Sequence, residues 1–297
     1  MLKTRAVRLL AISDLHLSSA VNRDALSALP AFPRDWLIVA GDVAERLGTV
    51  ARAFATLAER FARVIWVPGN HDLWAIAEDG GVPLAGQARY EALVALAREH
   101  GVLTPEDPYV EWPGAGDPVT IAPLFVLYDY SFRPAHVARE EVVGWARAGR
   151  AVCADELYLD PAPFASREAW CAARLASTRR RLDALPRGRR TVLVNHFPLR
   201  ADLVRIPRVP RFAPWCGTRQ TEDWHLRYDA LAVVSGHLHV RRTDWRDGTR
   251  FEEVSLGYPR QWNQALGMAH YLRQILPHPG REARATRPSS GAGSRAT

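Results

Sequence analysis

Seven side chains of metal-ligand type follow five short apolar runs of this 297-residue sequence. Each run ends in one of the polar fragments S-D-L-H, G-D, G-N-H-D, N-H or G-H-L-H. The candidate donors in these fragments are Asp14, His16, Asp42, Asn70, His196, His237 and His239. One such fragment alone is common in turns. Five of them, each directly after an apolar run, indicate a single metal site instead.

The donor types also indicate which metals the site takes. Imidazole nitrogens with carboxylate and amide oxygens, and without thiolate, suit Mn, Fe, Co, Ni and Zn and argue against a structural cysteine-zinc site. Seven donors are too many for one tetrahedral ion and suit two ions that share a bridging ligand. The sequence therefore predicts two divalent or trivalent ions as cofactors. The candidates are Mn, Fe, Zn and Co, with Mn and Fe favoured.

Distant donors meet only if the elements before them bring them together. Near-continuous apolar runs predict strands buried on both faces, at 7–13, 36–40, 64–67, 121–127, 191–195 and 231–235. Apolar residues at helical spacing predict helices at 49–62, 90–100 and 166–185. Asp-Gly at 247–248 predicts a β-hairpin. In an α/β sheet the carboxyl ends of the strands lie at one edge, so this order predicts one site at that edge.

Composition indicates a globular protein with one domain over 1–280 and a disordered basic tail over 281–297. The tail holds four arginines, one glutamate and no apolar periodicity. The rest of the chain has no uninterrupted apolar stretch of about 18 residues, so no membrane partner is expected. Three cysteines without a CxxC pattern give neither a disulfide framework nor a zinc finger, and we expect a cytoplasmic protein.

The fragments D-x-H, G-D, G-N-H-D, H and G-H-x-H stand in the order and spacing of a known superfamily. Over about residues 7–255 the chain resembles the calcineurin-like metallophosphoesterases. The resemblance implies an α/β fold in which a β-sandwich core is flanked by helices, in four layers α/β/β/α. It implies that one metal is held by Asp14, His16, Asp42 and His239. The other would be held by Asp42, Asn70, His196 and His237, so that Asp42 bridges the two.

The resemblance also implies a mechanism of phosphate-ester hydrolysis. Two metals lower the pKa of a bridging water, and the resulting hydroxide attacks phosphorus in line while the metals neutralise charge on the phosphoryl oxygens. His71 resembles the family's candidate for the catalytic residue that protonates the departing oxygen or hydrogen-bonds to it. Asp72, the next residue, either orients the imidazole of His71 or serves only as a turn residue, and we favour orientation.

Further segments indicate the phosphate ester. Residues 106–109, 127–134, 212–218 and 255–262 (E-D-P-Y, L-Y-D-Y-S-F-R-P, F-A-P-W-C-G-T and S-L-G-Y-P-R-Q-W) resemble a branch that includes phosphopantetheinyl hydrolases. Those enzymes cut the phosphodiester that joins 4′-phosphopantetheine to a serine of an acyl carrier protein. Carrier proteins are acidic, and the basic loop at 198–218 suits an acidic partner. In the alternative, its arginines form ordinary surface ion pairs; they are Arg200, Arg205, Arg208 and Arg211.

Two other functions stay open. One is a phosphodiesterase or phosphatase acting on nucleotides, such as cyclic nucleotides, dinucleoside polyphosphates or nucleic acid ends. A nucleic-acid groove combines basic and aromatic side chains along its length. Here they combine only over 205–218, so a nucleic acid partner is not favoured. The other function is a metal-containing phosphoprotein-binding module, against which the complete donor set with His71 argues.

Overall fold

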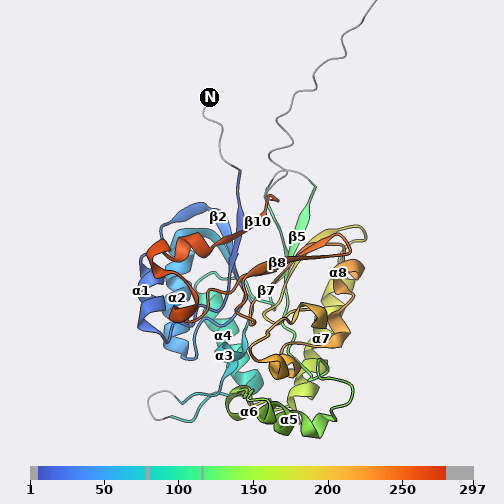
Figure 1. Cartoon of the computed structure of the whole chain (residues 1–297). Helices are drawn as coiled ribbons and strands as arrows, with labels where there is room; N and C mark the ends of the chain where they lie inside the picture. The colour runs from blue at the N-terminus through green and yellow to red at the C-terminus, as the bar shows by residue number, and fades with distance from the viewer. Residues whose placement is uncertain (1–5, 78–80, 115–116, 279–297) are drawn as a thin grey trace, which may run out of the picture.

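Two β-sheets lie against each other at the centre of the protein, with helices on both outer sides (Figure 1). The computed structural model describes residues 6–77, 81–114 and 117–278. The first sheet has the order β10-β1-β2-β3, with β1 (Leu9–Ile12), β2 (Phe32–Val39), β3 (Phe61–Trp66) and β10 (Arg273–Leu276). The second has the order β4-β5-β6-β7-β9-β8, with β4 (Val110–Glu111), β5 (Val119–Pro123), β6 (Arg190–Val194), β7 (Ala230–Ser235), β8 (Arg242–Arg246) and β9 (Thr249–Glu253).

The helices form the two outer layers and one end of the molecule. Figure 1 shows α1 and α2 on one side of the sheets, α7 and α8 on the other, and α5 and α6 at the lower end. The α-helices are α1 (Ala20–Ser27), α2 (Leu47–Arg60), α3 (Asn70–Leu73), α4 (Gly86–Glu99), α5 (Val142–Ala148), α6 (Asp155–Tyr158), α7 (Arg167–Asp183) and α8 (Trp224–Arg227). Short 3-10 helices are η1 (Arg139–Glu141), η2 (Ala201–Leu203), η3 (Pro210–Trp215), η4 (Arg219–Thr221), η5 (Pro259–Gln261), η6 (Gln264–Leu266) and η7 (Met268–Tyr271).

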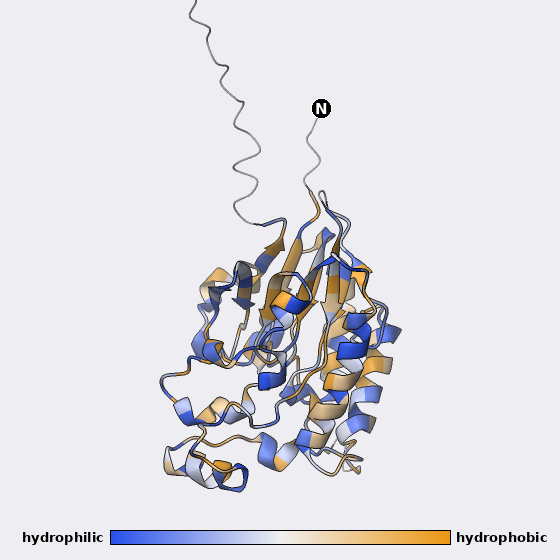
Figure 2. Ribbon diagram, turned by 90° about the vertical axis from the view of Figure 1, so that its right-hand side faces the viewer, coloured by the Kyte–Doolittle hydropathy of each residue, from blue (hydrophilic) through white to orange (hydrophobic). Residues whose placement is uncertain are grey.

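The strands are apolar on both faces because each face has something to pack against. Alternate residues of β1 show the division: Leu9 lies in the apolar core between the sheets, whereas Leu10 lies in the core under the helices. Leu37 and Ile38 of β2 divide in the same way. In Figure 2 the strands are largely hydrophobic and the outer faces of the helices are hydrophilic. The near-continuous apolar runs of the sequence therefore correspond to buried strands, as predicted.

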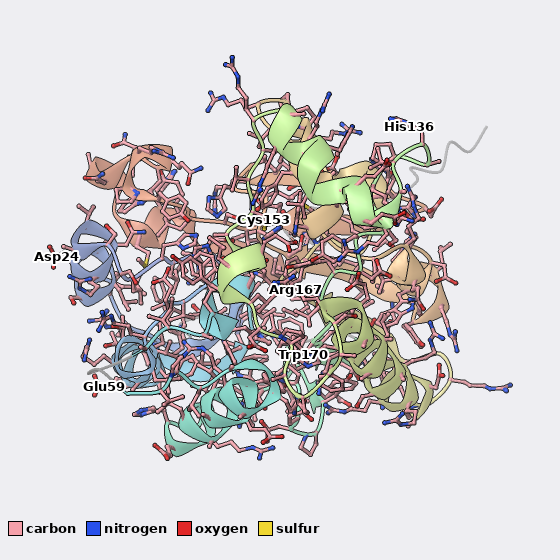
Figure 3. The ribbon with its side chains drawn as sticks, turned by 90° about the horizontal axis from the view of Figure 1, so that it is seen from below. Asp24, Glu59, His136, Cys153, Arg167 and Trp170 are labelled. Carbon is pink, nitrogen blue, oxygen red and sulfur yellow. The ribbon has the colours of Figure 1, made fainter. Side chains whose placement is uncertain are left out.

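The parallel strands of both sheets end at the same side of the molecule. The pairs β1–β2, β2–β3, β5–β6, β6–β7 and β7–β9 are all parallel. A parallel bridge between Ser13 and Ser255 joins the two sheets beyond the ends of β1 and β9. Figure 3 looks onto this end, where Cys153 and Arg167 lie near the centre of the face. The carboxyl ends of the strands therefore converge at one end of the molecule, as the sequence predicted. A site there can take residues from both sheets.

Three helix boundaries differ from their predicted positions for local reasons. Helix α2 begins at Leu47, two residues before the predicted start, so that Thr49 is a buried residue inside it. Helix α4 begins at Gly86, four residues before the predicted start, where the amide of Gln87 donates to the carbonyl of Ala162. Helix α7 begins after Ser166, whose hydroxyl accepts from the amide of Ala169 as an N-cap. The hairpin β8–β9 forms across Asp247-Gly248 as predicted.

The predicted basic tail, 281–297, lies outside the described residues, so the domain boundary stays a prediction. Within the part of the chain that is described, no helix is long and apolar enough to cross a membrane.

Candidate metal centre

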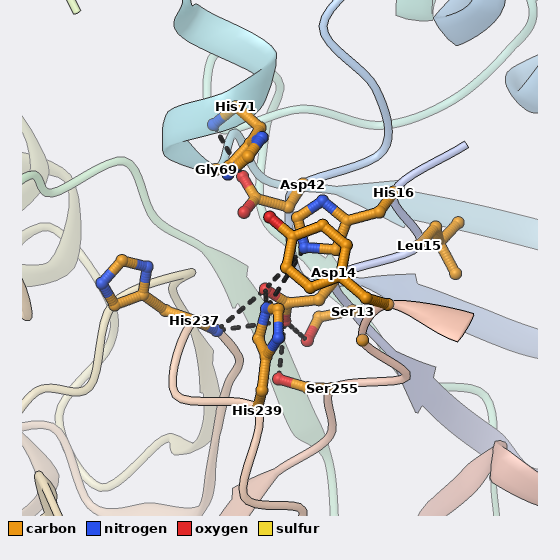
Figure 4. A network of polar contacts seen from close by, with 12 residues as sticks. Ser13, Asp14, Leu15, His16, Asp42, Gly69, His71, His237, His239 and Ser255 are labelled. Carbon is orange, nitrogen blue, oxygen red and sulfur yellow. Dashed lines mark hydrogen bonds and ion pairs between the residues drawn. The ribbon is translucent and has the colours of Figure 1, made fainter. Parts of the chain in front are cut away.

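The structure brings the seven predicted donors together at the strand ends. Figure 4 labels five of them, Asp14, His16, Asp42, His237 and His239. Asp14 and His16 follow β1, and Asp42 follows β2. Asn70 begins α3 after β3, His196 follows β6, and His237 and His239 follow β7. Three overlapping groups have donor atoms within 4.8 Å of one another; they are Asp14–His16–His239, His16–Asp42–His71 and Asp14–Asp42–His196. Donors from both sheets therefore share one site.

The backbone at this site adopts a strained conformation that directs the donor side chains toward the centre. Five of the seven donors have a positive φ, between 43° and 70°; they are Asp14, His16, Asp42, His237 and His239. L-residues avoid this left-handed region unless the surroundings enforce it, and such strain concentrates at functional sites. Here the strand ends turn abruptly, so that the two donors of D-x-H and of H-x-H both reach the centre.

Two glycines of the fragments are needed because donors approach them closely. A Cβ on Gly69 would lie 2.1 Å from Oδ1 of Asp42, and one on Gly236 would lie 2.3 Å from Oδ2 of Asp14. No side chain fits at these distances. The glycines of G-N-H-D and G-H-L-H thus leave room for the two buried carboxylates.

Hydrogen bonds around His196 and Asn70 turn acceptor atoms toward one another. Nδ1 of His196 donates to the carbonyl of Ala40 at 2.8 Å, which leaves Nε2 with a lone pair. The amide nitrogen of Asn70 donates to Asp155, so its Oδ1 faces Nε2 of His196 at 3.1 Å. Oδ2 of Asp42 lies 3.5 Å from the same Nε2. Three acceptors facing one another without a proton fit a bound cation.

Around His239, hydrogen bonds likewise turn a ring nitrogen toward the centre. Oε1 of Gln261 accepts from the amide of Tyr258 and from Nδ1 of His239, so Nε2 of His239 faces the centre. This Nε2 lies 3.0 Å from Oδ1 of Asp14 and 3.2 Å from Nε2 of His16. His237 lies on the side of His196: its Nδ1 is 3.2 Å from Oδ1 of Asn70, and its Nε2 is buried without a hydrogen-bond partner among the described residues. The donor set and its orientation fit a centre of more than one cation.

The two buried carboxylates dominate the electrostatics of the centre. Burial, together with the charges of Asp14 and Asp72, raises the pKa of Asp42. Burial lowers the pKa of His16 to about 3, and the neighbouring His71 adds to this effect. Burial also lowers the pKa of His239, but the carboxylate of Asp14 outweighs it and raises that pKa to about 9. Bound cations would offset this concentration of buried negative charge.

His71 lies beside the centre and is held by Glu45. Its Nδ1 is 2.8 Å from Oε1 of Glu45, and its ring centroid is 3.7 Å from that of Trp74. Burial raises the pKa of Glu45, but hydrogen bonds from His71 and Ser18 outweigh this and lower the pKa to about 2. Glu45 is therefore a carboxylate that fixes the imidazole. The side chain of His71 is 13% exposed, so a substrate can reach it.

The prediction that Asp72 orients His71 is wrong. The carboxylate of Asp72 is fully buried and turned away, toward backbone amides of the preceding loops. It accepts from the amides of Asp42, Val43, Ala44 and Gly69 and from Nε1 of Trp66. Asp72 thus holds the Asp42 loop against the start of α3. Glu45, three residues after Asp42, has the role expected of Asp72.

Asp155 of α6 is a further site residue that the sequence did not indicate. It is fully buried, and its Oδ1 accepts from the amide of Asn70 at 2.9 Å and from Nε1 of Trp74 at 2.7 Å. This contact fixes which atom of the Asn70 amide faces the centre. Asp155 is 85 positions from Asn70 and stands in no motif, so no local pattern marks it.

Only some of the arginines in the basic loop at 198–218 make ion pairs or hydrogen bonds with the rest of the protein. Arg200 pairs with Asp202 at 2.9 Å, and Arg211 donates to the carbonyl of Trp145 at 2.7 Å. Arg205 and Arg208 are exposed, and neither has an ion pair or side-chain hydrogen bond within the described ranges. The ion-pair alternative therefore holds for Arg200, and docking of an acidic partner on the loop stays a prediction.

The sequence model of the calcineurin-like phosphoesterase family matches residues 7–241. The chain belongs to this family. The predicted family is thereby confirmed, and family membership together with the grouped donors supports a two-metal centre.

PptH of Mycobacterium tuberculosis is similar to this family member in sequence and in structure over most of its length. The acyl-carrier-protein phosphodiesterase PptH of Mycobacterium tuberculosis (strain ATCC 25618 / H37Rv) is 49% identical over 271 residues, which are 91% of this chain and 83% of that protein. The crystal structure of phosphopantetheinyl hydrolase PptH from Mycobacterium tuberculosis matches with a TM-score of 0.87 at 48% identity. The match covers 92% of this chain and 97% of that chain. The predicted fold, two sheets flanked by helices, is confirmed.

Proposed function

We propose that this phosphoesterase hydrolyses the phosphodiester of holo-acyl carrier protein and releases 4′-phosphopantetheine. The observation that carries the proposal is the 49% identity to an acyl-carrier-protein phosphodiesterase over 91% of the chain. The exposed Arg205 and Arg208 support it, since they suit an acidic carrier. The three free cysteines are all buried, in keeping with a cytoplasmic reaction.

The proposed ligands follow the two sides of the centre. Asp14, His16, Asp42 and His239 would hold one ion, and Asp42, Asn70, His196 and His237 would hold the other. Asp42 would be shared, since its carboxylate groups with His16 and also with His196. Mn and Fe are the favoured ions, with Zn and Co as alternatives, since the donors are imidazole nitrogens and oxygens.

Different residues of the chain have different roles in the proposed hydrolysis. Ions bound at the centre supply acidification of water and neutralisation of phosphoryl charge. Glu45 accepts from Nδ1 of His71, which leaves Nε2 as the ring nitrogen that serves the departing serine oxygen. Trp74 packs on the same imidazole and limits its rotation. Ser13 and Ser255 donate to Oδ2 of Asp14, so that Oδ1 stays directed to the centre.

The test is incubation of the purified protein and Mn²⁺ with holo-carrier protein, followed by mass spectrometry of the carrier. Loss of the phosphopantetheine mass is the expected result. An unchanged carrier, alongside turnover of cyclic nucleotides or bis(p-nitrophenyl) phosphate, would replace the proposal by a nucleotide phosphodiesterase. Bound metal without turnover of any ester would favour a phosphoprotein-binding module.

A further inference from the structure

Helix α6 and the residues before it expose apolar side chains beside the metal centre. Val152 is 68% exposed, Leu157 is 77% exposed and Tyr158 is 40% exposed. We name these three residues the α6 patch. Exposed apolar side chains that gather in one place mark interaction surfaces more often than scattered ones do. In Figure 3 the segment with Cys153, next to Val152, crosses the middle of the face that carries the strand ends.

The α6 patch is continuous with the centre through Trp74. The ring centroids of Tyr158 and Trp74 are 5.2 Å apart, and those of Trp74 and His71 are 3.7 Å apart. The amide of Ala75 donates to the carbonyl of Tyr158. On its inner side the same helix carries Asp155, which orients Asn70. Anything large that reaches His71 from this side also touches the α6 patch.

The α6 patch is exposed although helix α6 is firmly held by hydrogen bonds and ion pairs to its neighbours. Arg167 donates to the carbonyl of Asp155 and to the carboxylate of Glu156. Glu156 also accepts from the hydroxyl of Tyr130 and from Nε1 of Trp215. These contacts anchor α6 from beneath and use the acidic side chains of the helix internally. The outward face of α6 is left with its apolar residues.

The exposed cations next to the α6 patch are arginines. Arg147 near the end of α5 and Arg150 just before Val152 are exposed, and neither has an ion pair or side-chain hydrogen bond in the part of the chain that the structure describes. Helix η3 packs on α5 through Arg211, which lies over the ring of Trp145 at 4.9 Å. Apolar residues bordered by unpaired cations suit an acidic protein surface.

We propose that the α6 patch, with Arg147 and Arg150, is the surface on which the acidic carrier domain docks. The inference rests on the proposed function. In a serine phosphodiester the phosphorus is three single bonds of about 1.5 Å from the serine Cα, so the carrier backbone must come within roughly 5 Å of the phosphorus that is attacked at the centre. The carrier therefore presses against whatever borders His71, and the α6 patch is that border on the Trp74 side.

The test compares two substrates in matched variants. Leu157→Glu removes an apolar contact and adds a charge that repels an acidic carrier. We expect its KM for holo-carrier protein to rise about tenfold or more, as for a central interface residue, with kcat/KM for bis(p-nitrophenyl) phosphate unchanged. Leu226→Glu places the same change on α8, where Leu226 is 58% exposed, and should alter neither value.

A second variant keeps the test decisive if Leu157→Glu disturbs the fold. Arg150→Glu should raise the KM for the carrier, more so at low salt, and leave the small diester unaffected. Unchanged carrier KM in Arg150→Glu and in any folded Leu157→Glu would overturn the docking proposal. The activity of the wild-type protein separates the two proposals. If the wild type does not release phosphopantetheine from the carrier, the proposed function is wrong. If the wild type releases it and the variants are equally active, only the proposed docking surface is wrong.

Discussion

At the scale of single residues, the two carboxylates next to His71 have different tasks. Glu45 contacts the imidazole itself, whereas Asp72 accepts from four backbone amides and the indole of Trp66. An interpretation from sequence favoured Asp72 because it is adjacent to His71. Adjacency misleads here because α3 begins at Asn70, and consecutive side chains on a helical turn point in different directions.

The role of His71 predicts that His71→Ala retains its metal and loses turnover. We expect kcat to fall by about 10²–10⁴-fold, the usual contribution of a general acid or base. Metal analysis of the purified variant should still find the wild-type content. Since a nitrogen of His71 lies within 4.8 Å of donor atoms of His16 and Asp42, loss of metal in this variant would instead identify His71 as a ligand.

For Glu45 we predict that Glu45→Gln lowers kcat about tenfold with unchanged metal content and KM. The amide can still accept from Nδ1 of His71, but a charged acceptor makes a hydrogen bond roughly twice as strong. Asp72→Asn is the contrasting variant: it should lower the melting temperature, since four backbone amides lose a charged acceptor. If Glu45→Gln were as active as the wild type, Glu45 would be only a surface partner of His71.

At the scale of elements, the strands and their ends could be predicted, and the contacts between loops could not. Strand signals are local, since a buried strand is apolar along its whole length and the polar fragment follows directly. The order of the motifs in the family then identified the metal donors. Asp155 and Glu45 act across 85 and 26 positions, and an acidic residue in a short helix or a loop is ordinary. Only the packing of α6 and of the loop after β2 gives these two their partners.

The position of α6 predicts that Asp155→Ala weakens metal binding. Without its acceptor, the amide of Asn70 is free to turn its nitrogen toward His196, and a lost outer-shell partner typically costs about 10–100-fold in metal affinity. A metal titration of the apoprotein should detect weaker binding at one of two sites. Trp74→Phe is the matched control for metal affinity, because it removes the other hydrogen bond to Asp155 and keeps an aromatic ring beside His71. Equal affinity in wild type and Asp155→Ala would contradict the role of α6.

At the scale of the whole molecule, the centre joins the two sheets. Its donors come from the ends of β1, β2 and β3 in one sheet and of β6 and β7 in the other. The buried carboxylates of Asp14 and Asp42 follow neighbouring strands of the first sheet, and both group with His196, which follows β6 of the second sheet. Bound ions therefore stabilise the contact between the layers as well as supplying the chemistry.

Removal of the metals should lower the melting temperature and abolish activity together. A ligand at 100 times its Kd stabilises the folded state by about 2.7 kcal/mol. In a large domain each kcal/mol is worth about 2–4 °C, so chelation should lower the transition by about 5 °C or more. Thermal unfolding with EDTA, and again after excess Mn²⁺, measures this difference. A transition that does not move would mean that the ions contribute nothing to the contact between the sheets.

The separation of the donors along the chain also has a consequence for biosynthesis. Asp14 and His239 lie 3.0 Å apart in the folded protein but 225 positions apart in the chain. At about 5–20 residues per second, a ribosome needs roughly 10–45 s to pass from the first to the second. No nascent fragment that ends before β7 can hold both ions. We therefore expect both ion sites to be completed only late in synthesis, once the segment with His237 and His239 has emerged from the ribosome.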